Sequence, residues 1–280
     1  MAMPDRYAVF GNPVRHSRSP QIHSAFAEQT GQAMSYHAQL VERGQFDAAA
    51  RQFFDQGGCG LNITVPYKED ACRFADSLSE RARRAAAVNT LMRRGDGAIY
   101  GDNTDGAGLL RDLTENLKWP VAGQRVLLLG AGGAVRGVLE PLLRQAPASL
   151  TVANRTVARA DQLAAEFADL GAALQGCAYD ALVGRQFDLV INGTSASLSG
   201  ELPDLPTDVL SDSACCYDMV YGAEPTPFMR WAATEAAWAV ADGLGMLVEQ
   251  AAESFALWRG VRPDTRPVID AVRRSLSAAL

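Results

Sequence analysis

The stretch LLLGAGGAVRG, residues 127–137, places a glycine-rich turn directly between an apolar run and a helical pattern. Glycines in this context let the backbone approach a pyrophosphate, whose charge is held by free N–H groups at the helix start. The match to the dinucleotide pattern G-x-G-x-x-G is incomplete, because Val135 occupies the place of the third glycine. The stretch therefore predicts nucleotide binding at residues 130–134, with a purely structural tight turn as the alternative.

The order of elements around this turn predicts the fold class. Short apolar runs alternate with helical patterns along most of the chain, which is typical of an α/β protein with a largely parallel sheet. Residues 105–242 read as a Rossmann-like, doubly wound dinucleotide-binding domain. Residues 1–104 read as a separate N-terminal α/β substrate-binding domain, and the C-terminal helices of residues 243–280 are expected to return to it.

Three patterns in the N-terminal half predict local structure. Ser19 before Pro20 predicts the N-cap of a helix that Gly31 closes. The segment 67–87 reads as one continuous helix, and the glycines of residues 95–97 predict a hairpin turn.

The end of the second strand of the nucleotide-binding half indicates which dinucleotide is bound. An NAD site usually has an acid there to accept from the ribose 2′-OH, whereas this strand is followed by Asn154, Arg155 and Thr156. An acid would repel a 2′-phosphate, while Arg155 and Arg159 can pair with one. The sequence thus predicts NADP, and the alternative is that both arginines are solvated surface charges.

Composition and charge exclude several classes of partner. The 280 residues carry a net charge of −6 with a pI near 5.2, and no polybasic run is present to bind nucleic acid or an anionic membrane. No secretory pattern or apolar stretch of about 20 residues is present, so we expect a cytoplasmic protein. We also expect a monomer or homodimer that acts on a small-molecule substrate. The five cysteines and three histidines lack disulfide or metal-site spacing, so no metal is expected.

Polar residues gather at predicted strand ends and loop starts of the first half, where α/β proteins place their sites. Ser17 and Ser19 stand at a helix start that can bind a carboxylate, although Ser19 could serve only as a cap. Lys68 opposes the dipole in the first turn of its helix, although it could be a surface lysine. Thr64, Asn89 and Asp105 complete this set of polar residues.

Eight motifs, in order along nearly the whole chain, resemble those of the shikimate dehydrogenase family. They are AVFGNPVRHSRSP, NITVPYKE, AVNTL, GDNTDGAG, GAGGAVRG, NRTVAR, YDMVY and ADGLGMLVEQ. The resemblance implies reversible NADPH-dependent reduction of 3-dehydroshikimate to shikimate, a step toward chorismate and the aromatic amino acids.

The same resemblance implies roles for individual residues. It makes Lys68 and Asp105 the catalytic pair, with Lys68 as the main proton donor. For the substrate, it implies contacts from Ser17, Ser19, Thr64, Asn89, Tyr221 and Gln250. For the cofactor, it implies contacts from Glu80, Gly130, Ala131, Gly132, Gly133, Ala134, Asn154, Arg155, Thr156, Val157, Ala158, Arg159, Met219 and Gly243.

One position departs from the family pattern. After FDLVIN the family usually reads Asn-Ala-Thr-Ser-x-Gly, whereas this chain has NGTSAS with Ser197 in place of the glycine. If that glycine has a positive φ, Ser197 is expected to carry backbone strain or to reshape the loop.

Two alternative functions remain open at the level of sequence. One is a quinate/shikimate dehydrogenase that also uses NAD, although the acid usual for that relative at the second strand is absent. The other is a catalytically silent regulatory protein that binds shikimate or NADP, although such proteins commonly lose the acid–base pair, here Lys68 and Asp105.

Overall fold

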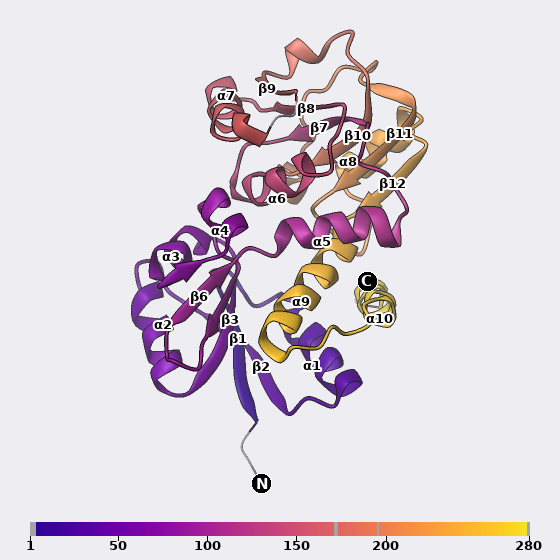
Figure 1. The fold of residues 1–280 in the computed structure, drawn as a ribbon. Helices are drawn as coiled ribbons and strands as arrows, with labels where there is room; N and C mark the ends of the chain where they lie inside the picture. Colours follow the sequence, from indigo (N-terminus) through magenta and orange to yellow (C-terminus); the bar gives the residue numbers. More distant parts are fainter. Residues whose placement is uncertain (1–3, 171–172, 195, 279–280) are drawn as a thin grey trace. The chain divides into compact units, whose positions relative to one another are not determined.

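A computed structural model describes residues 4–170, 173–194 and 196–278, and the chain divides into two compact units. Unit 1 is formed by the chain up to Gly108 together with Val248–Arg274, and unit 2 mainly by Leu109–Leu247. Each unit is built on its own six-stranded sheet. Figure 1 shows the two sheets and their helices, with colours that follow the sequence from indigo to yellow. The predicted α/β fold class is confirmed.

The sheet of unit 1 has the strand order β2-β1-β3-β5-β6-β4. Its strands are β1 (Asp5–Gly11), β2 (Met34–Leu40), β3 (Gly58–Ile63), β4 (Ser77–Leu78), β5 (Thr90–Arg93) and β6 (Ile99–Asp102). The first three pair in parallel, whereas β5 and β6 form an antiparallel hairpin whose turn contains Gly97 with φ 90°. The predicted hairpin is therefore confirmed.

Aromatic side chains fill both faces of this sheet. Phe10 of β1 packs edge-on against Phe53 on one face, and Phe26 packs against Phe255 on the other. The helices that supply residues to unit 1 are α1 (Ser19–Thr30), α2 (Phe46–Asp55), α3 (Lys68–Phe74), α4 (Glu80–Ala85), and parts of α5 (Asp105–Arg111), α9 (Leu244–Arg259) and α10 (Arg266–Ser277). Side chains alternate along a strand, so Asn62 of β3 faces away from its buried neighbours Leu61 and Ile63.

Two local predictions for unit 1 are wrong. Ser19 is not the N-cap of α1, because the helix begins at Ser19 after Arg18, and the Ser19 N–H donates to the Ser17 hydroxyl at 3.3 Å. The segment 67–87 is not one helix, because β4 pairs with β6 in its middle and separates α3 from α4. Sheet pairing thus overrides a helical pattern. The predicted end of α1 at Gly31 is confirmed by its left-handed φ of 65°.

The sheet of unit 2 has the strand order β12-β11-β10-β7-β8-β9, and all of its neighbours are parallel. The chain begins at the centre with β7, builds outward to β9, and then returns to build β10 to β12 on the other side. This is the predicted doubly wound order. The strands are β7 (Arg125–Leu129), β8 (Ser149–Ala153), β9 (Leu174–Cys177), β10 (Phe187–Asn192), β11 (Leu210–Asp218) and β12 (Ala239–Asp242).

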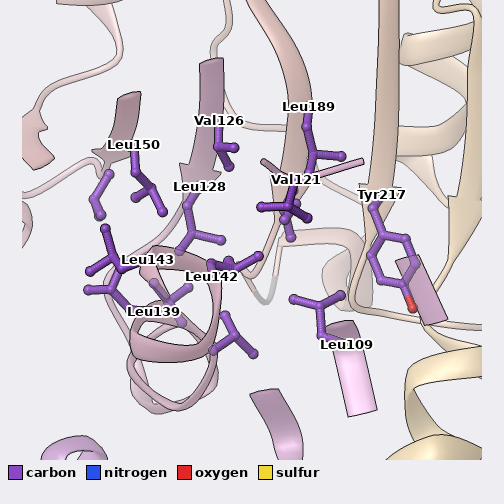
Figure 2. Close-up of a cluster of buried hydrophobic side chains, with 14 of the residues drawn as sticks. Leu109, Val121, Val126, Leu128, Leu139, Leu142, Leu143, Leu150, Leu189 and Tyr217 are labelled. Atoms are coloured by element: carbon purple, nitrogen blue, oxygen red, sulfur yellow. The ribbon is translucent and has the colours of Figure 1, made fainter. Parts of the chain in front are cut away.

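The strand β7 is buried on both faces, which explains its unbroken apolar sequence. Val126 and Leu128 belong to one core cluster, whereas Leu127 and Leu129 belong to another. Figure 2 shows the first cluster, with Leu139, Leu142 and Leu143 opposite the strands. These leucines lie on α6 (Gly133–Leu143). Unit 2 also contains α7 (Val157–Glu166), α8 (Pro227–Thr234), the π-helical turn Asp112–Asn116, and the 3₁₀ turns Ala168–Leu170, Asp180–Leu182 and Ala196–Ser199. Within the described residues, no helix is both long and apolar enough to cross a membrane.

Candidate active site

Lys68 and Asp105 form an ion pair in unit 1, with Lys68 Nζ 2.5 Å from Asp105 Oδ2. Lys68 is the first residue of α3, which follows β3 after a short turn, and Asp105 is the first residue of α5, which follows β6. The two side chains are 23% and 9% exposed, so this lysine is not a free surface charge. The fold thus brings together a proton donor and a carboxylate that lie far apart in the sequence.

Asn89 fixes the orientation of this pair from the opposite side. Its Nδ2 donates to Asp105 Oδ1 at 2.7 Å and lies 3.3 Å from Gln250 Oε1. Its Oδ1 accepts from the backbone N–H of Thr104 at 2.9 Å, which sets the direction of the amide. Asn89 is buried, so the Asp105 carboxylate is held by one lysine and one rigid amide.

A buried polar layer continues from Asn89, and the sequence analysis did not single it out. Asn62 Nδ2 donates to Thr90 Oγ1 at 3.2 Å and to Ser254 Oγ at 3.0 Å. Asn62 Oδ1 accepts from the Tyr36 hydroxyl at 2.7 Å. A polar residue inside an otherwise apolar strand was the available signal, because buried polar groups need such partners.

Ser17, Ser19 and Thr64 lie at the carboxyl ends of β1 and β3. These strands are parallel neighbours in which Phe10 pairs with Ile63, so the loop before α1 and the start of α3 share one edge of the sheet. Thr64 packs so closely on Gly11 that a Cβ there would lie 2.4 Å from Thr64 Cγ2. The carboxyl edge of a parallel sheet is where α/β proteins bind ligands.

In unit 2, the glycine-rich turn has the geometry that a pyrophosphate requires. Gly130 has a φ of 100°, which other residues rarely adopt, and a Cβ there would lie 3.2 Å from Thr194 Cγ2. Apart from neighbours along the chain, no atom of the described residues lies within 4 Å of the positions that Cβ atoms on Gly132 and Gly133 would take. Because α6 begins at Gly133, its first N–H groups are free to bind an anion at this open backbone. Residues 130–134 therefore fit the pyrophosphate of a dinucleotide.

The loop after β8 presents the candidate 2′-phosphate residues. Asn154 Nδ2 donates to the Thr156 carbonyl at 2.9 Å, which closes the turn before α7. Residues 155–159 are exposed, including Arg155 and Arg159. One guanidinium group in the loop before α7 and one in the first turn of α7 are therefore accessible to a phosphate.

Met219 and Gly243 lie next to one another at the ends of β11 and β12. A Cβ on Gly243 would lie 2.3 Å from the Met219 carbonyl oxygen, so only glycine fits at this position. Tyr221 follows in the same loop and is half-buried. Glu80 belongs to unit 1, where it is the exposed first residue of α4.

The expected strain at Ser197 is absent. Ser197 lies within the 3₁₀ turn Ala196–Ser199 and therefore has right-handed backbone geometry. Its hydroxyl donates to Asp218 Oδ2 at 2.7 Å and accepts from Asn192 Nδ2 at 3.2 Å. Across the described residues, no group of three or more His, Cys, Asp and Glu side chains could hold a metal ion.

Three family profiles match successive parts of the chain. One described as "Shikimate dehydrogenase substrate binding domain" matches residues 9–91. One described as "Shikimate / quinate 5-dehydrogenase" matches residues 112–199, and one described as "Shikimate 5'-dehydrogenase C-terminal domain" matches residues 243–273.

Individual relatives are similar over nearly their whole length. A "Shikimate dehydrogenase (NADP(+))" from Methylococcus capsulatus is 60% identical over 270 residues, which are 96% of this chain and 96% of that protein. The crystal structure of an Ael1 enzyme from Pseudomonas putida is 50% identical, with a TM-score of 0.91, and the match covers 95% of this chain and 97% of that chain. A shikimate 5-dehydrogenase from Thermus thermophilus, solved with NADP(H) and shikimate, is 34% identical, with a TM-score of 0.86 and coverage of 97% and 100%.

Proposed function

The chain belongs to the shikimate dehydrogenase family, and we propose that it is the NADP-dependent enzyme that reversibly reduces 3-dehydroshikimate to shikimate. The observation that carries this proposal is the Lys68–Asp105 pair, which Asn89 holds in place. A silent binding protein would have no need of an acid–base pair in this arrangement. The reaction belongs to the route toward chorismate and the aromatic amino acids.

We assign the substrate to residues 1–104 with the helices of residues 243–280, and the cofactor to residues 105–242. The polar network around Asn89 supports the first assignment, and the open glycine turn supports the second. When bound, NADPH supplies the hydride that reduces the ketone carbon.

Lys68 and Asp105 supply the proton chemistry of the reaction. Negative charge develops on the carbonyl oxygen during reduction, and the Lys68 ammonium can stabilise that charge and donate the proton. Asp105 orients the Lys68 side chain through their hydrogen bond, and its other oxygen accepts from Asn89. In the direction of oxidation, the same pair removes the proton from the hydroxyl.

The other residues serve to position the two reactants. We propose that Ser17 and Ser19 bind the substrate carboxylate, and that Thr64, Asn89, Tyr221 and Gln250 bind its ring and hydroxyl groups. The amides of residues 130–134 would hold the pyrophosphate, and Asn154, Arg155, Thr156, Val157, Ala158 and Arg159 the adenosine phosphate. Met219 and Gly243 would border the nicotinamide, and Glu80 would lie near the cofactor.

The absorbance of NADPH during oxidation of shikimate tests this function directly. We expect turnover with shikimate and NADP, and much less with quinate or NAD. Comparable turnover with quinate and NAD would indicate the broader quinate/shikimate enzyme, and binding of shikimate without turnover would indicate a silent regulator. Light scattering of the same sample measures whether the protein is the monomer or the homodimer that we propose.

The variant Lys68→Ala tests the role of the ion pair. We expect kcat to fall by about 10²–10⁴-fold, the usual contribution of general acid–base catalysis, with shikimate bound within about tenfold of wild type. Lys118 is exposed and is the only other lysine in the sequence, so Lys118→Ala is the matched control and should keep full activity. Near-normal turnover in Lys68→Ala would refute the assignment.

A further inference from the structure

The carboxylate of Asp218, the last residue of β11, is fully buried and accepts four hydrogen bonds. Its Oδ1 accepts from Asn192 Nδ2 and from the Val220 N–H, both at 3.1 Å. Its Oδ2 accepts from Ser197 Oγ at 2.7 Å and from Thr226 Oγ1 at 2.5 Å. Burial raises the pKa of this carboxyl, so each donor matters for keeping its charge inside the protein.

The loop that follows β10 touches both segments assigned to the cofactor. Its Thr194 Cγ2 lies 3.2 Å from the position of a Cβ on Gly130, the first glycine of the pyrophosphate turn. A Cβ on Gly193 would lie 2.5 Å from Val135 Cγ2 in α6 and 3.1 Å from Met219 Sδ. The loop therefore fills the space between the glycine turn and Met219, and any shift of the loop must move one of them.

The backbone on the nicotinamide side is held by the same network. The Met219 N–H donates to the Asn192 carbonyl at 2.9 Å, and the Gly243 N–H donates to the Val220 carbonyl at 3.2 Å. Asp218 thus connects the end of β10, the loop after it, and the turn after β11 in one hydrogen-bond network. Ser197 is the residue of this network that comes from the loop.

We propose that Ser197 is a positioning residue for the nicotinamide half of NADP. Its hydroxyl bridges Asn192 and Asp218, and so links the 3₁₀ turn Ala196–Ser199 to the ends of β10 and β11, beside Met219. A glycine, which the family pattern has at this position, could not make either hydrogen bond. The proposal rests on the proposed function, because it assumes that Met219 borders the nicotinamide.

Ser197→Ala removes the two hydrogen bonds without adding bulk, and Ser199→Ala is the matched control. Ser199 lies in the same 3₁₀ turn, but its hydroxyl donates to the Ala196 carbonyl at 3.0 Å and the residue is exposed. Ser197→Gly, which restores the family residue, is a second variant that keeps the test valid should the alanine variant fold poorly.

The measurement is equilibrium binding of NADP and of adenosine 2′,5′-bisphosphate, a fragment that lacks the nicotinamide. We expect Ser197→Ala and Ser197→Gly to weaken NADP binding by about tenfold, the value of one hydrogen bond to a charged group. The same variants should weaken binding of the fragment by less than about twofold. In kinetics, KM for NADP should rise while KM for shikimate stays unchanged. Ser199→Ala should match wild type in every constant.

Equal weakening of both ligands, or binding of NADP like that of wild type, would overturn the proposal. These outcomes are separate from a failure of the proposed function. A wild-type protein that binds NADP but does not oxidise shikimate would refute the function, while the binding comparison would still decide the role of Ser197.

Discussion

Arg155 is the residue on which the choice between NADP and NAD depends most directly. It is exposed at the end of β8, where no acid is present to accept from a ribose hydroxyl. Arg155→Asp should weaken NADP binding by about tenfold or more, because the new carboxylate repels the 2′-phosphate, and should change NAD binding little. Equilibrium titration with each cofactor measures both effects.

A charge-matched control separates this local effect from the change in net charge. Arg43 is an exposed arginine in unit 1, and Arg43→Asp should leave the binding of both cofactors unchanged. A similar loss of NADP and NAD binding in Arg155→Asp would mean that Arg155 does not recognise the 2′-phosphate.

His23 makes the stability of unit 1 depend on pH. The residue is fully buried in α1, its ring stacks on Tyr36 at 4.3 Å, and neither ring nitrogen has a hydrogen-bond partner among the described residues. Burial lowers the pKa of His23 from 6.5 to about 3, because an imidazolium ion is poorly solvated there.

The sign of the effect follows from which state binds the proton. Below pH 6.5 the unfolded chain protonates His23 while the folded chain does not, so the contribution of this residue is complete above pH 6.5 and is lost as the pH falls toward 3. The free energy of unfolding should fall by about 1.4 kcal/mol per pH unit from this residue. Urea unfolding at several pH values between 6.5 and 4.5 gives the free energy of unfolding as a function of pH. The slope of this dependence should be smaller for His23→Leu than for wild type. His16 is exposed, and His16→Leu should keep the wild-type slope.

Elements whose formation depends on local sequence could be predicted, and elements that depend on distant pairing could not. The β7 strand, the glycine turn and α6 were predicted because an apolar run and a turn of fixed chemistry stand next to one another. The break between α3 and α4 could not be predicted, because β4 has only two residues and exists through its pairing with β6. The strand β9, LQGC, lacks the β-branched and aromatic residues that mark strands.

The candidate site shows the same division between local and distant information. Lys68, Asp105 and Asn89 were selected by their places at predicted strand ends and loop starts, and the family resemblance implied their roles. Their hydrogen bonds became visible only in the fold. Asn62 was missed because its partners, Thr90 and Ser254, come from β5 and α9. A single polar residue in a strand gives no information about which distant segments will satisfy it.

The close packing of α9 on the sheet of unit 1 makes Gly60 intolerant of any side chain. A Cβ there would lie 2.5 Å from Trp258 Nε1 and 2.9 Å from the Leu91 carbonyl oxygen. Trp258 Nε1 donates to that carbonyl at 3.0 Å, so an added methyl group would break this hydrogen bond between α9 and β5.

Gly60→Ala should therefore destabilise the protein by about 1–3 kcal/mol, the usual cost of overpacking, and lower Tm by several degrees. Gly95→Ala is the matched control. Gly95 lies in the hairpin turn, and apart from its chain neighbours no described residue has an atom within 4 Å of its Cβ position. Thermal melts of the two variants give the comparison. A Tm for Gly60→Ala equal to that of Gly95→Ala would show that Trp258 can move away without cost.

At the scale of the whole molecule, the two units differ in how the chain builds them. Unit 2 is formed mainly by one continuous segment, and Leu109 and Met246 near its two ends belong to the same core cluster. Unit 1 needs two segments, because Val248–Arg274 packs with the first 108 residues. The stability of unit 1 thus depends on a segment that follows most of unit 2 in the sequence.

This difference predicts opposite behaviour for two fragments. Residues 109–247 alone should unfold cooperatively in urea, because their sheet and core are complete. Residues 1–108 alone should not, because they lack Phe255, which packs on Phe26, and Ser254, which satisfies Asn62. Far-UV circular dichroism during urea titration distinguishes a cooperative transition from a gradual one.

Adding back the missing segment makes this prediction specific. Residues 248–274, joined to residues 1–108 by a flexible linker, should restore a cooperative transition, because α9 would again supply Phe255, Ser254 and the Trp258 hydrogen bond to Leu91. The same linked protein with Phe255→Ala should lose about 3–5 kcal/mol of that stability, since this side chain is fully buried. A cooperative transition in residues 1–108 alone, with the same midpoint as the linked protein, would show that the N-terminal sheet is stable without α9.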